Sequence, residues 1–316
     1  MARYLLRRLA QALLVLWAAF TVSFVILFLL PGDPVAIMLN PGGQATYVDP
    51  AAEAALRAEL GFDQPLLVQY GQRLAAAVQG DFGTSIRTGA PVLSAIAAAL
   101  PETLKLAGLG LLIGVLGGAA LAVLATYLRR AWLRESLLSL PPLGIAVPTF
   151  WAGLMLLQVF SFRLGWFPAF GNTGFLSLVL PALTLALPTG AVVAQVLAGS
   201  LQSTWRQPFV EVVQAKGASR LRTHLGHVLR NATIPSLTIV GLVIGNAVAG
   251  SVVVETVFSR SGIGRLMQTA VTEQDIPLVQ GLVVLSAVVF VVVNLLVDLA
   301  YPLIDPRITT RRKAAL

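Results

Sequence analysis

The amino-acid sequence predicts an all-α integral membrane protein with six transmembrane helices. The chain has 316 residues, of which 57% are hydrophobic and only 11% are charged. Its mean hydropathy of +0.83 lies well outside the range of soluble domains. The apolar residues gather in runs of about 20, the length with which a helix crosses roughly 30 Å of hydrocarbon. Lysine and arginine residues lie between these runs and are divided unevenly between the two sides of the membrane.

Six apolar segments are long enough to cross a membrane. They are residues 9–30, 101–128, 136–160, 176–199, 234–257 and 280–304. The first contains an uncharged run at 11–30 and ends in the sequence PGDP rather than in a small-residue cleavage site. Because its apolar core is longer than the roughly 7–15 residues of a secretory signal peptide, we expect it to be retained as a span.

The basic residues orient the chain in the membrane. Fifteen of the 22 lysine and arginine residues share one side, and they are Arg3, Arg7, Arg8, Arg129, Arg130, Arg134, Arg206, Lys216, Arg220, Arg222, Arg230, Arg307, Arg311, Arg312 and Lys313. Six spans put both termini on that side, and cytoplasmic loops carry the basic excess. We therefore expect cytoplasmic termini and no nucleic-acid partner, because the net charge of +8 reflects orientation.

The segment between the first two spans forms most of the opposite, extracytoplasmic surface. Asp49 and Pro50 cap a strong helix-forming stretch that Gly61 ends, a second helix is expected at 64–78, and the sequence GDFGTSIRTGAP reads as a loop. The segment is too small for an enzyme domain and suits a lid or a docking surface. We divide the chain into residues 1–100, the first span with this segment, and residues 101–316, a five-span core with a cytoplasmic loop at 205–235.

The loop at 211–235 has more structure than a soluble connector needs. Leu221, Leu225, Val228 and Leu229 form an apolar stripe at helical spacing, and a small-residue break at 217–219 precedes it. The pattern predicts a helix, a bend and a second helix. An interfacial helix on anionic lipid and packing within the chain are alternatives. Docking to a partner protein is favoured because the bend divides the apolar face into short pieces.

Several chemistries are not expected from this sequence. The absence of cysteine excludes disulfides, thiolate metal sites and cysteine nucleophiles. His224 and His227 have a spacing that could hold a metal on a helix, but other ligands are missing nearby, so we expect no metal site. The sequence contains no Gly-x-x-x-x-Gly-Lys-Ser/Thr motif and no recognisable catalytic set. We therefore expect a subunit that is not an enzyme.

Motifs along most of the chain resemble one family of membrane transport proteins. In order they are PGDP, GDFGTSIRTGAPV, LPETLKLAG, VPTFWAGLMLLQVFSFRLGWFPAFG, AKGASRLRTHLGHVLRNATIP, ETVFSRSGIGRLMQTAVTEQDIPLVQG and YPLIDPR. They resemble the dipeptide, oligopeptide and nickel branch of the permease subunits of ABC-type importers. Glu211 and Gly217 match the family's Glu-Ala-Ala-x-x-x-Gly loop, although Val212 and Val213 replace its two alanines and Pro235 lies later than its proline.

The resemblance implies a type I ABC importer permease fold with a coupling helix that contacts a cytoplasmic ATPase. The matching positions are Glu211, Ala215, Lys216, Gly217, Ala218, Ser219 and Arg220. Gly217 suits this role because glycine allows a backbone conformation or a close approach that a side chain hinders. It could also be only a helix stop. This chain would carry no cofactor, because the partner ATPase subunits would bind ATP and magnesium.

The resemblance also implies partners, location and substrate. The partners are a second homologous permease, two cytoplasmic ATP-binding cassette subunits, an extracytoplasmic substrate-binding protein and membrane lipid, in the inner or plasma membrane of a prokaryote. Short peptides are the expected substrates, and nickel chelates, glutathione and oligosaccharides are alternatives within the same class. A stand-alone secondary transporter is a further alternative, disfavoured because no internal repeat is evident.

Three residues of the fifth predicted span are weak candidates for the substrate pathway. Asn246 and Glu255 are polar residues within an apolar segment, where such residues are costly and often functional. Gly250 lies near Asn246, but glycines in spans equally often allow close helix packing. Glu255 lies near a span end, where an interfacial position or an ion pair is the alternative.

Overall fold

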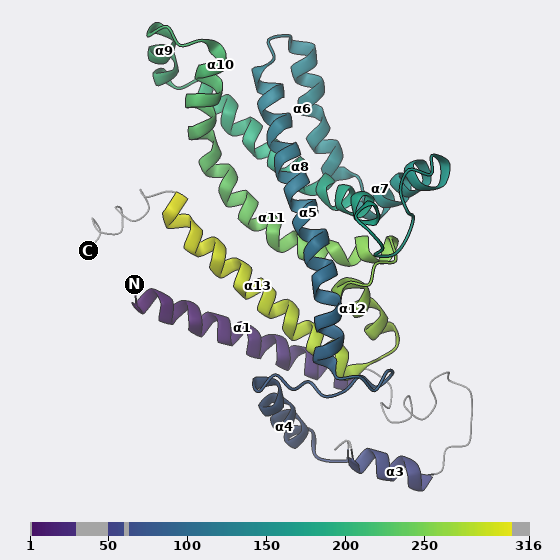
Figure 1. Ribbon diagram of the computed structural model, residues 1–316. Helices are drawn as coiled ribbons and strands as arrows, with labels where there is room; N and C mark the ends of the chain where they lie inside the picture. The colour runs from purple at the N-terminus through teal and green to yellow at the C-terminus, as the bar shows by residue number, and fades with distance from the viewer. Residues whose placement is uncertain (1, 30–49, 60–62, 305–316) are drawn as a thin grey trace. The chain divides into compact units, whose positions relative to one another are not determined.

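The computed structural model describes residues 2–29, 50–59 and 63–304. Regular structure in these ranges is helical apart from one isolated bridge between Thr84 and Pro91, which confirms the predicted all-α class (Figure 1). The chain forms two compact units, one from residues 1–101 with 265–292 and one from residues 102–264 with 293–316. Three helices, α5, α12 and α13, contribute residues to both units.

The first unit contains the amino-terminal helix and the predicted extracytoplasmic segment. Its elements are α1 (Ala2–Leu29), α3 (Pro50–Glu59), α4 (Leu66–Val78), the beginning of α5 (Val92–Tyr127), most of α12 (Ile263–Thr272) and the first part of α13 (Ile276–Ile304). α3 and α4 match the two helices predicted between the first two spans. Gly61, the predicted helix stop, lies outside the described residues.

The second unit contains the remaining helices and the predicted coupling loop. Its elements are the rest of α5, α6 (Ala131–Ala146), α7 (Thr149–Leu156), the π-helix η1 (Leu157–Arg163), α8 (Leu176–Trp205), α9 (Pro208–Ala215), α10 (Arg220–Arg222), the π-helix η2 (Thr223–Val228) and α11 (Leu229–Val257). α8 is the central helix, because α6, α7 and α11 all pack against it.

Four helices are long and apolar enough to cross a membrane singly. They are Leu6–Leu27 within α1, α5, α8, and Ile276–Val293 within α13. A fifth candidate is the pair formed by α6 and by α7 with η1, if this bent pair is one span. α11 covers the predicted segment 234–257 as one helix. These helices are compatible with six spans, and the count of six stays a prediction.

The predicted third span at 136–160 is not a straight helix. The chain bends by 105° between α6 and the helix formed by α7 with η1. Pro148 lies at the break, and proline disfavours a helical conformation in the residue before it. Val147 is accordingly extended, with φ −75° and ψ 122°. Hydropathy does not reveal the bend because the run stays apolar through it.

Small residues allow the helices of the second unit to approach closely. A Cβ added to Gly118 of α5 would lie 2.3 Å from the carbonyl oxygen of Gly190 of α8, so the two backbones touch. Leu106, Leu180 and Val254 are among the buried residues of the adjoining apolar core, to which α5, α8 and α11 all contribute. The relative positions of these three helices therefore rest on dense packing at glycines and on buried leucine and valine.

The predicted extracytoplasmic segment is attached within the first unit at two points. Tyr70 of α4 packs against Phe20 and Phe24 of α1, and its hydroxyl is 2.9 Å from Thr21 Oγ1. In the loop after α4, the Ser85 hydroxyl donates to Asp275 Oδ2 at 2.5 Å, and the backbone N–H of Ile86 donates to Asp275 Oδ1. These contacts fix α4 and the loop as parts of one surface.

Candidate functional site

The predicted coupling residues lie within residues 211–220 of the second unit, which we call the coupling segment. In chain order they are Glu211, Ala215, Lys216, Gly217, Ala218, Ser219 and Arg220. The first two lie in α9, the next three form a bend, Ser219 is the N-cap of α10 and Arg220 is its first residue. Ala218 and Arg220 are half-buried and the other five are exposed. The helix–bend–helix pattern expected from the sequence is present.

Gly217 ends α9 in a left-handed conformation. Its φ is +84°, and no heavy atom lies within 4 Å of an added Cβ. Glycine is thus required here by backbone conformation and not by lack of space. The N–H of Gly217 donates to the Gln214 carbonyl, and the N–H of Ala218 donates to the Val213 carbonyl. This pair of bonds is the Schellman motif, which gives the segment a defined turn.

Four side chains surround His224 just beyond the coupling segment. We call this group the His224 cluster, and its members are Thr126, Tyr127, Trp205, Arg220 and His224. The His224 side chain is fully buried, and its ring lies 5.6 Å from the ring centroids of both Tyr127 and Trp205. The Arg220 guanidinium lies 5.3 Å from the centre of the Tyr127 ring, within the range of a cation–π interaction.

Hydrogen bonds define the protonation of the His224 ring. Trp205 Nε1 can only donate, and it lies 2.8 Å from His224 Nδ1, which must therefore accept. The proton of the neutral ring is then on Nε2, which lies 3.2 Å from the Val123 carbonyl oxygen and 3.4 Å from the Thr126 hydroxyl. Burial lowers the pKa of His224 below its ordinary value, and the nearby Arg220 charge acts in the same direction, while the bond to Val123 opposes them.

A second polar group in the same unit joins three of the sequence motifs, and we call it the Glu102–Arg260 network. Its members are Glu102, Thr103, Asn172, Glu255 and Arg260. The buried Arg260 guanidinium donates to Glu102 Oε2 at 2.9 Å, to the Gly171 carbonyl and to the Ser177 carbonyl. Asn172 also donates to Glu102, at 2.6 Å. The network links the part of α5 at Glu102 and Thr103, the segment before α8 and the segment after α11.

Glu255 accepts hydrogen bonds from two neighbouring segments within this network. Thr103 Oγ1 donates to it at 2.6 Å and the backbone N–H of Gly264 at 2.7 Å. Only 1% of the Glu255 surface is exposed. A Cβ added to Gly262 would lie 2.3 Å from the Glu255 carboxyl carbon, so the chain passes directly over the carboxylate. This geometry favours a role in holding the segment after α11.

The three predicted pathway residues lie at different positions along one helix. All lie in α11, and the side chain of Asn246 is outside the described residues. A Cβ added to Gly250 would lie 3.3 Å from Leu185 Cδ1, which is a packing contact with α8. Neither Gly250 nor Glu255 lines the cavity of the first unit described below or the hollow between α5, α6 and α8. Their role in a pathway stays a prediction.

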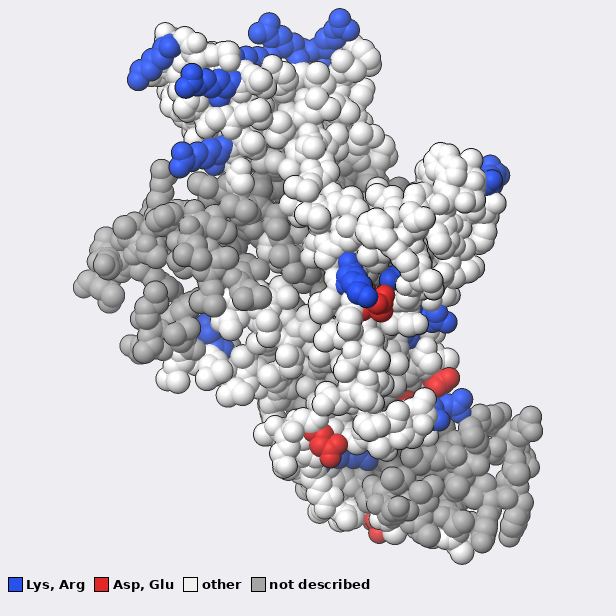
Figure 2. All heavy atoms as spheres, in the orientation of Figure 1, with Lys and Arg blue, Asp and Glu red and all other residues white. Residues whose placement is uncertain are grey.

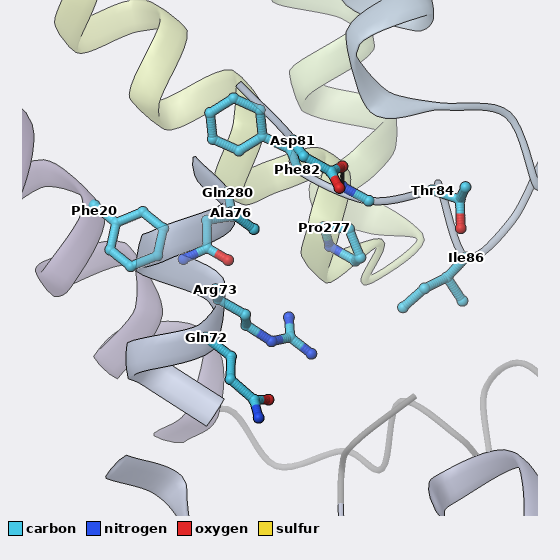
Figure 3. Close-up of a pocket in the computed structure, with 11 residues that line it drawn as sticks. Phe20, Gln72, Arg73, Ala76, Asp81, Phe82, Thr84, Ile86, Pro277 and Gln280 are labelled. Atoms are coloured by element: carbon cyan, nitrogen blue, oxygen red, sulfur yellow. Dashed lines mark hydrogen bonds between the residues drawn. The ribbon is translucent and has the colours of Figure 1, made fainter. Parts of the chain in front are cut away.

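The first unit has a cavity of about 320 Å³ between α1, α4, the loop after α4 and α13. Its lining residues are Phe20, Gln72, Arg73, Ala76, Asp81, Phe82, Gly83, Thr84, Ile86, Pro277 and Gln280. Arg73 and Asp81 give it one basic and one acidic side chain, and Figure 3 shows Arg73 extending from α4 toward the middle of the labelled group. Burial lowers the pKa of Arg73. The cavity suits a partly charged, partly apolar group.

Basic side chains gather at the end of the second unit that carries the coupling segment. Figure 2 shows Lys and Arg atoms over the α5–α6 turn and over α9 and α10. Arg129 and Arg130 belong to the turn, and Lys216 and Arg222 to the loop. The basic surface and the coupling segment thus share one face of the unit, as the charge distribution in the sequence predicts.

Some residues of these groups were not identified from the sequence. Glu102, Asn172, Arg260 and Trp205 received no functional assignment, and His224 was considered only as a metal ligand. The opposite charges of Glu102 and Arg260, each next to an apolar segment, were the available signal. Trp205 carried none, because a tryptophan at the end of an apolar helix is common.

Comparisons with known proteins agree with this fold. Residues 110–310 match the family described as "Binding-protein-dependent transport system inner membrane component", and residues 1–107 match its amino-terminal family. A probable peptide ABC transporter permease of Sinorhizobium fredii is 36% identical over 316 residues, covering 98% of this chain and 99% of its own. The glutathione transport system permease protein of Salmonella paratyphi A is 36% identical over 308 residues, with the same coverage.

Two solved structures share the fold at low sequence identity. A crystal structure of an amino acid ABC transporter aligns with a TM-score of 0.54 and 19% identity, covering 66% of this chain and 94% of its own. The MetNI methionine ABC transporter, in an inward-facing conformation, aligns with a TM-score of 0.54 and 14% identity over 67% of this chain and 97% of its own.

The helical membrane fold and these matches show which class of protein this chain is and to which family it belongs. The chain is a multi-pass inner-membrane permease subunit of an ABC importer. It belongs to the family of binding-protein-dependent transport system inner membrane components.

Proposed function

We propose that this chain forms half of the translocation pathway of an ATP-driven, binding-protein-dependent importer of short peptides. The observation that supports this most strongly is identity of 36% along almost the whole chain to a probable peptide ABC transporter permease. A glutathione permease is equally similar, and glutathione is itself a short peptide derivative. Glutathione is therefore the second candidate substrate, ahead of nickel chelates and oligosaccharides.

The proposed partners are a second homologous permease, two cytoplasmic ATP-binding cassette subunits and an extracytoplasmic binding protein. ATP and magnesium would bind to the cassette subunits, and this chain would neither bind a cofactor nor catalyse a reaction. The coupling segment would contact a cassette subunit on the cytoplasmic side, where both termini also lie. An exposed, helical bend beside a basic surface supports this assignment. A rigid protrusion of this kind can transmit a partner's closure to the spans.

The segment between α1 and α5 would receive the binding protein. Its helix α4 and the following loop are held on one surface by Tyr70 and by Ser85, and they wall the cavity of the first unit. A fixed surface with a hollow and charges of both signs suits the docking of a folded partner.

Reconstitution in proteoliposomes tests the proposed function. The chain, the second permease, the cassette subunits and the binding protein are combined, and uptake of a labelled dipeptide, glutathione, nickel and an oligosaccharide is measured with and without ATP. We expect uptake of the dipeptide or of glutathione that requires both ATP and the binding protein. Uptake by this chain alone without ATP would contradict the proposal and favour a secondary transporter.

A further inference from the structure

We propose that His224 is a positioning residue that holds the coupling segment in one orientation relative to α5 and α8. The proposal rests on the proposed function, in which the coupling segment contacts an ATPase. His224 itself would not touch substrate or ATPase. It would act through the coupling segment, which ends at Arg220, four residues before it.

The His224 ring joins three separate parts of the second unit. The ring belongs to η2, its Nδ1 accepts from Trp205 at the end of α8, and its Nε2 donates to the Val123 carbonyl near the end of α5. Both ring nitrogens are therefore used, each by a different helix. The ring is fully buried, so water cannot replace either partner without opening the structure.

The coupling segment is attached to the same point through Arg220. Its guanidinium lies over the rings of Tyr127 of α5 and Trp205 of α8, at 5.3 Å and 6.0 Å from their centres. The Thr223 hydroxyl donates to the carbonyl of Ser219, which ties η2 to the segment. The segment cannot tilt independently of the ends of α5 and α8 while these contacts persist. A displacement of the coupling segment by its partner would therefore also move the ends of α5 and α8.

The local helix geometry supports a special role for this position. Residues Thr223–Val228 form a π-helix between the α-helices α10 and α11. Such wide turns are rare, and they are frequent at functional sites. His227 lies three residues further on and is exposed, so the two histidines of the chain have opposite environments.

The contacts that hold the His224 cluster together should weaken when the His224 ring gains a proton. The charged group facing the ring is Arg220, while α5 faces it with Thr126 and the phenol of Tyr127, and α8 with Trp205. A protonated Nδ1 cannot accept from Trp205. Because burial lowers the folded-state pKa, the stabilisation is complete above the ordinary histidine pKa of about 6.5 and decreases as the pH falls below it.

The first test measures transported peptide per ATP hydrolysed in the reconstituted complex. His224→Gln keeps one acceptor and one donor, His224→Leu removes both, and His227→Leu is the matched control. We expect His224→Leu to lower the ratio at least about fivefold, the factor that corresponds to one lost hydrogen bond. The control and His224→Gln should stay near wild type. As the pH falls from about 7.5 to about 5.5, the ratio should fall in wild type but less in His224→Gln.

The second test needs no ATPase and so separates this proposal from the proposed function. The chain has no cysteine, so Gln214→Cys with Arg130→Cys provides two unique positions for spin labels on the full chain in nanodiscs. Electron paramagnetic resonance then gives the distance between the coupling segment and the turn that follows α5. We expect one narrow distribution in wild type and a broadened one with His224→Leu or at acidic pH.

The outcomes separate the possibilities. An unchanged transport ratio and an unchanged distance distribution in His224→Leu would overturn the positioning role. If His224→Leu does not fold, Trp205→Phe removes the N–H donor while keeping an aromatic ring, and it decides the question by the same two measurements. If the distance broadens but no ATPase assembles with the wild-type chain, the proposed function fails while the attachment of the segment through His224 stands.

Discussion

Gly217 is needed for its backbone conformation, whereas Arg260 is needed for its buried charge. Gly217 is exposed, and its φ of +84° is a backbone requirement that a β-branched residue meets only with strain. Arg260 is buried, and its charge is balanced by Glu102 and by two backbone carbonyls. Replacing Gly217 should change the shape of the exposed coupling segment. Replacing Arg260 should remove the donor to Glu102 and to the carbonyls of Gly171 and Ser177.

Gly217→Val should distort the coupling segment and reduce binding of the cassette subunits at least about fivefold, because a left-handed conformation costs a side chain about 1–2 kcal/mol. Gly217→Asn should have a smaller effect, since asparagine tolerates this conformation. Gly226→Val is the control, because Gly226 is also exposed and has no positive φ. Copurification and transport provide the measurement. Normal transport by Gly217→Val would refute the docking role.

The two cations that bind Glu102 should differ in their contribution to stability. Arg260→Met breaks a buried pair and should lower the free energy of unfolding by about 3 kcal/mol. Lys105→Met removes an exposed partner of the same carboxylate and should cost at most about 1 kcal/mol. Thermal unfolding of the full chain in nanodiscs compares the two variants. Equal losses would mean that burial does not determine the strength of this network.

At the scale of elements, the packing of α5 on α8 depends on which face of α5 carries a glycine. An added Cβ at Gly118 meets the Gly190 carbonyl, whereas an added Cβ at Gly117 meets nothing within 4 Å. Gly118 therefore lies on the face of α5 that contacts α8, and Gly117 lies on a face without a close neighbour among the described residues. Gly118 is required for the two helices to approach this closely, and Gly117 can be replaced by a residue with a side chain.

Gly118→Ala should force α5 and α8 apart and cost about 1–3 kcal/mol, because the contacted atom is backbone and cannot turn away. Gly117→Ala should be neutral or stabilising by up to about 1 kcal/mol, since alanine favours helix. The unfolding temperatures of the two variants in one detergent provide the comparison. A similar decrease in both would show that the close approach at Gly118 contributes nothing specific.

At the scale of the whole molecule, the surface proposed to dock the binding protein includes exposed apolar residues of α4. Leu67 is 85% exposed and Val78 is 81% exposed. The loop after α4 is also bound to Asp275, so a deletion of residues 44–88 would remove two of the hydrogen-bond donors to that buried carboxylate. Point substitutions on α4 therefore test docking more cleanly than a deletion.

Leu67→Glu together with Val78→Glu should reduce stimulation of ATP hydrolysis by the binding protein at least about tenfold, as expected when apolar contacts of an interface are replaced by charges. Basal hydrolysis and assembly should be unchanged, because neither side chain is packed inside the first unit. Titration of the reconstituted complex with binding protein gives the measurement. Full stimulation of the double variant would place the docking surface elsewhere.

Much of this architecture follows from local properties of the sequence. Apolar runs predict the helices, the lysine and arginine distribution predicts which loops share a side, and the glycine at 217 predicts the bend in the coupling segment. Each of these depends on neighbouring residues only, through hydration of apolar side chains or through the allowed backbone angles. The family motifs added the role of the permease and the residues that we predict to contact the ATPase.

The sequence by itself determined the helical membrane class, the helix–bend–helix loop and the family. The tertiary structure alone decided that α6 and α7 bend by 105°, that Glu102 binds Arg260 from 158 positions away, and that His224 joins α5 and α8. These features depend on which helix faces meet after packing. A hydrogen bond needs two atoms within about 3 Å of each other, and hydropathy or spacing along the chain does not specify that distance.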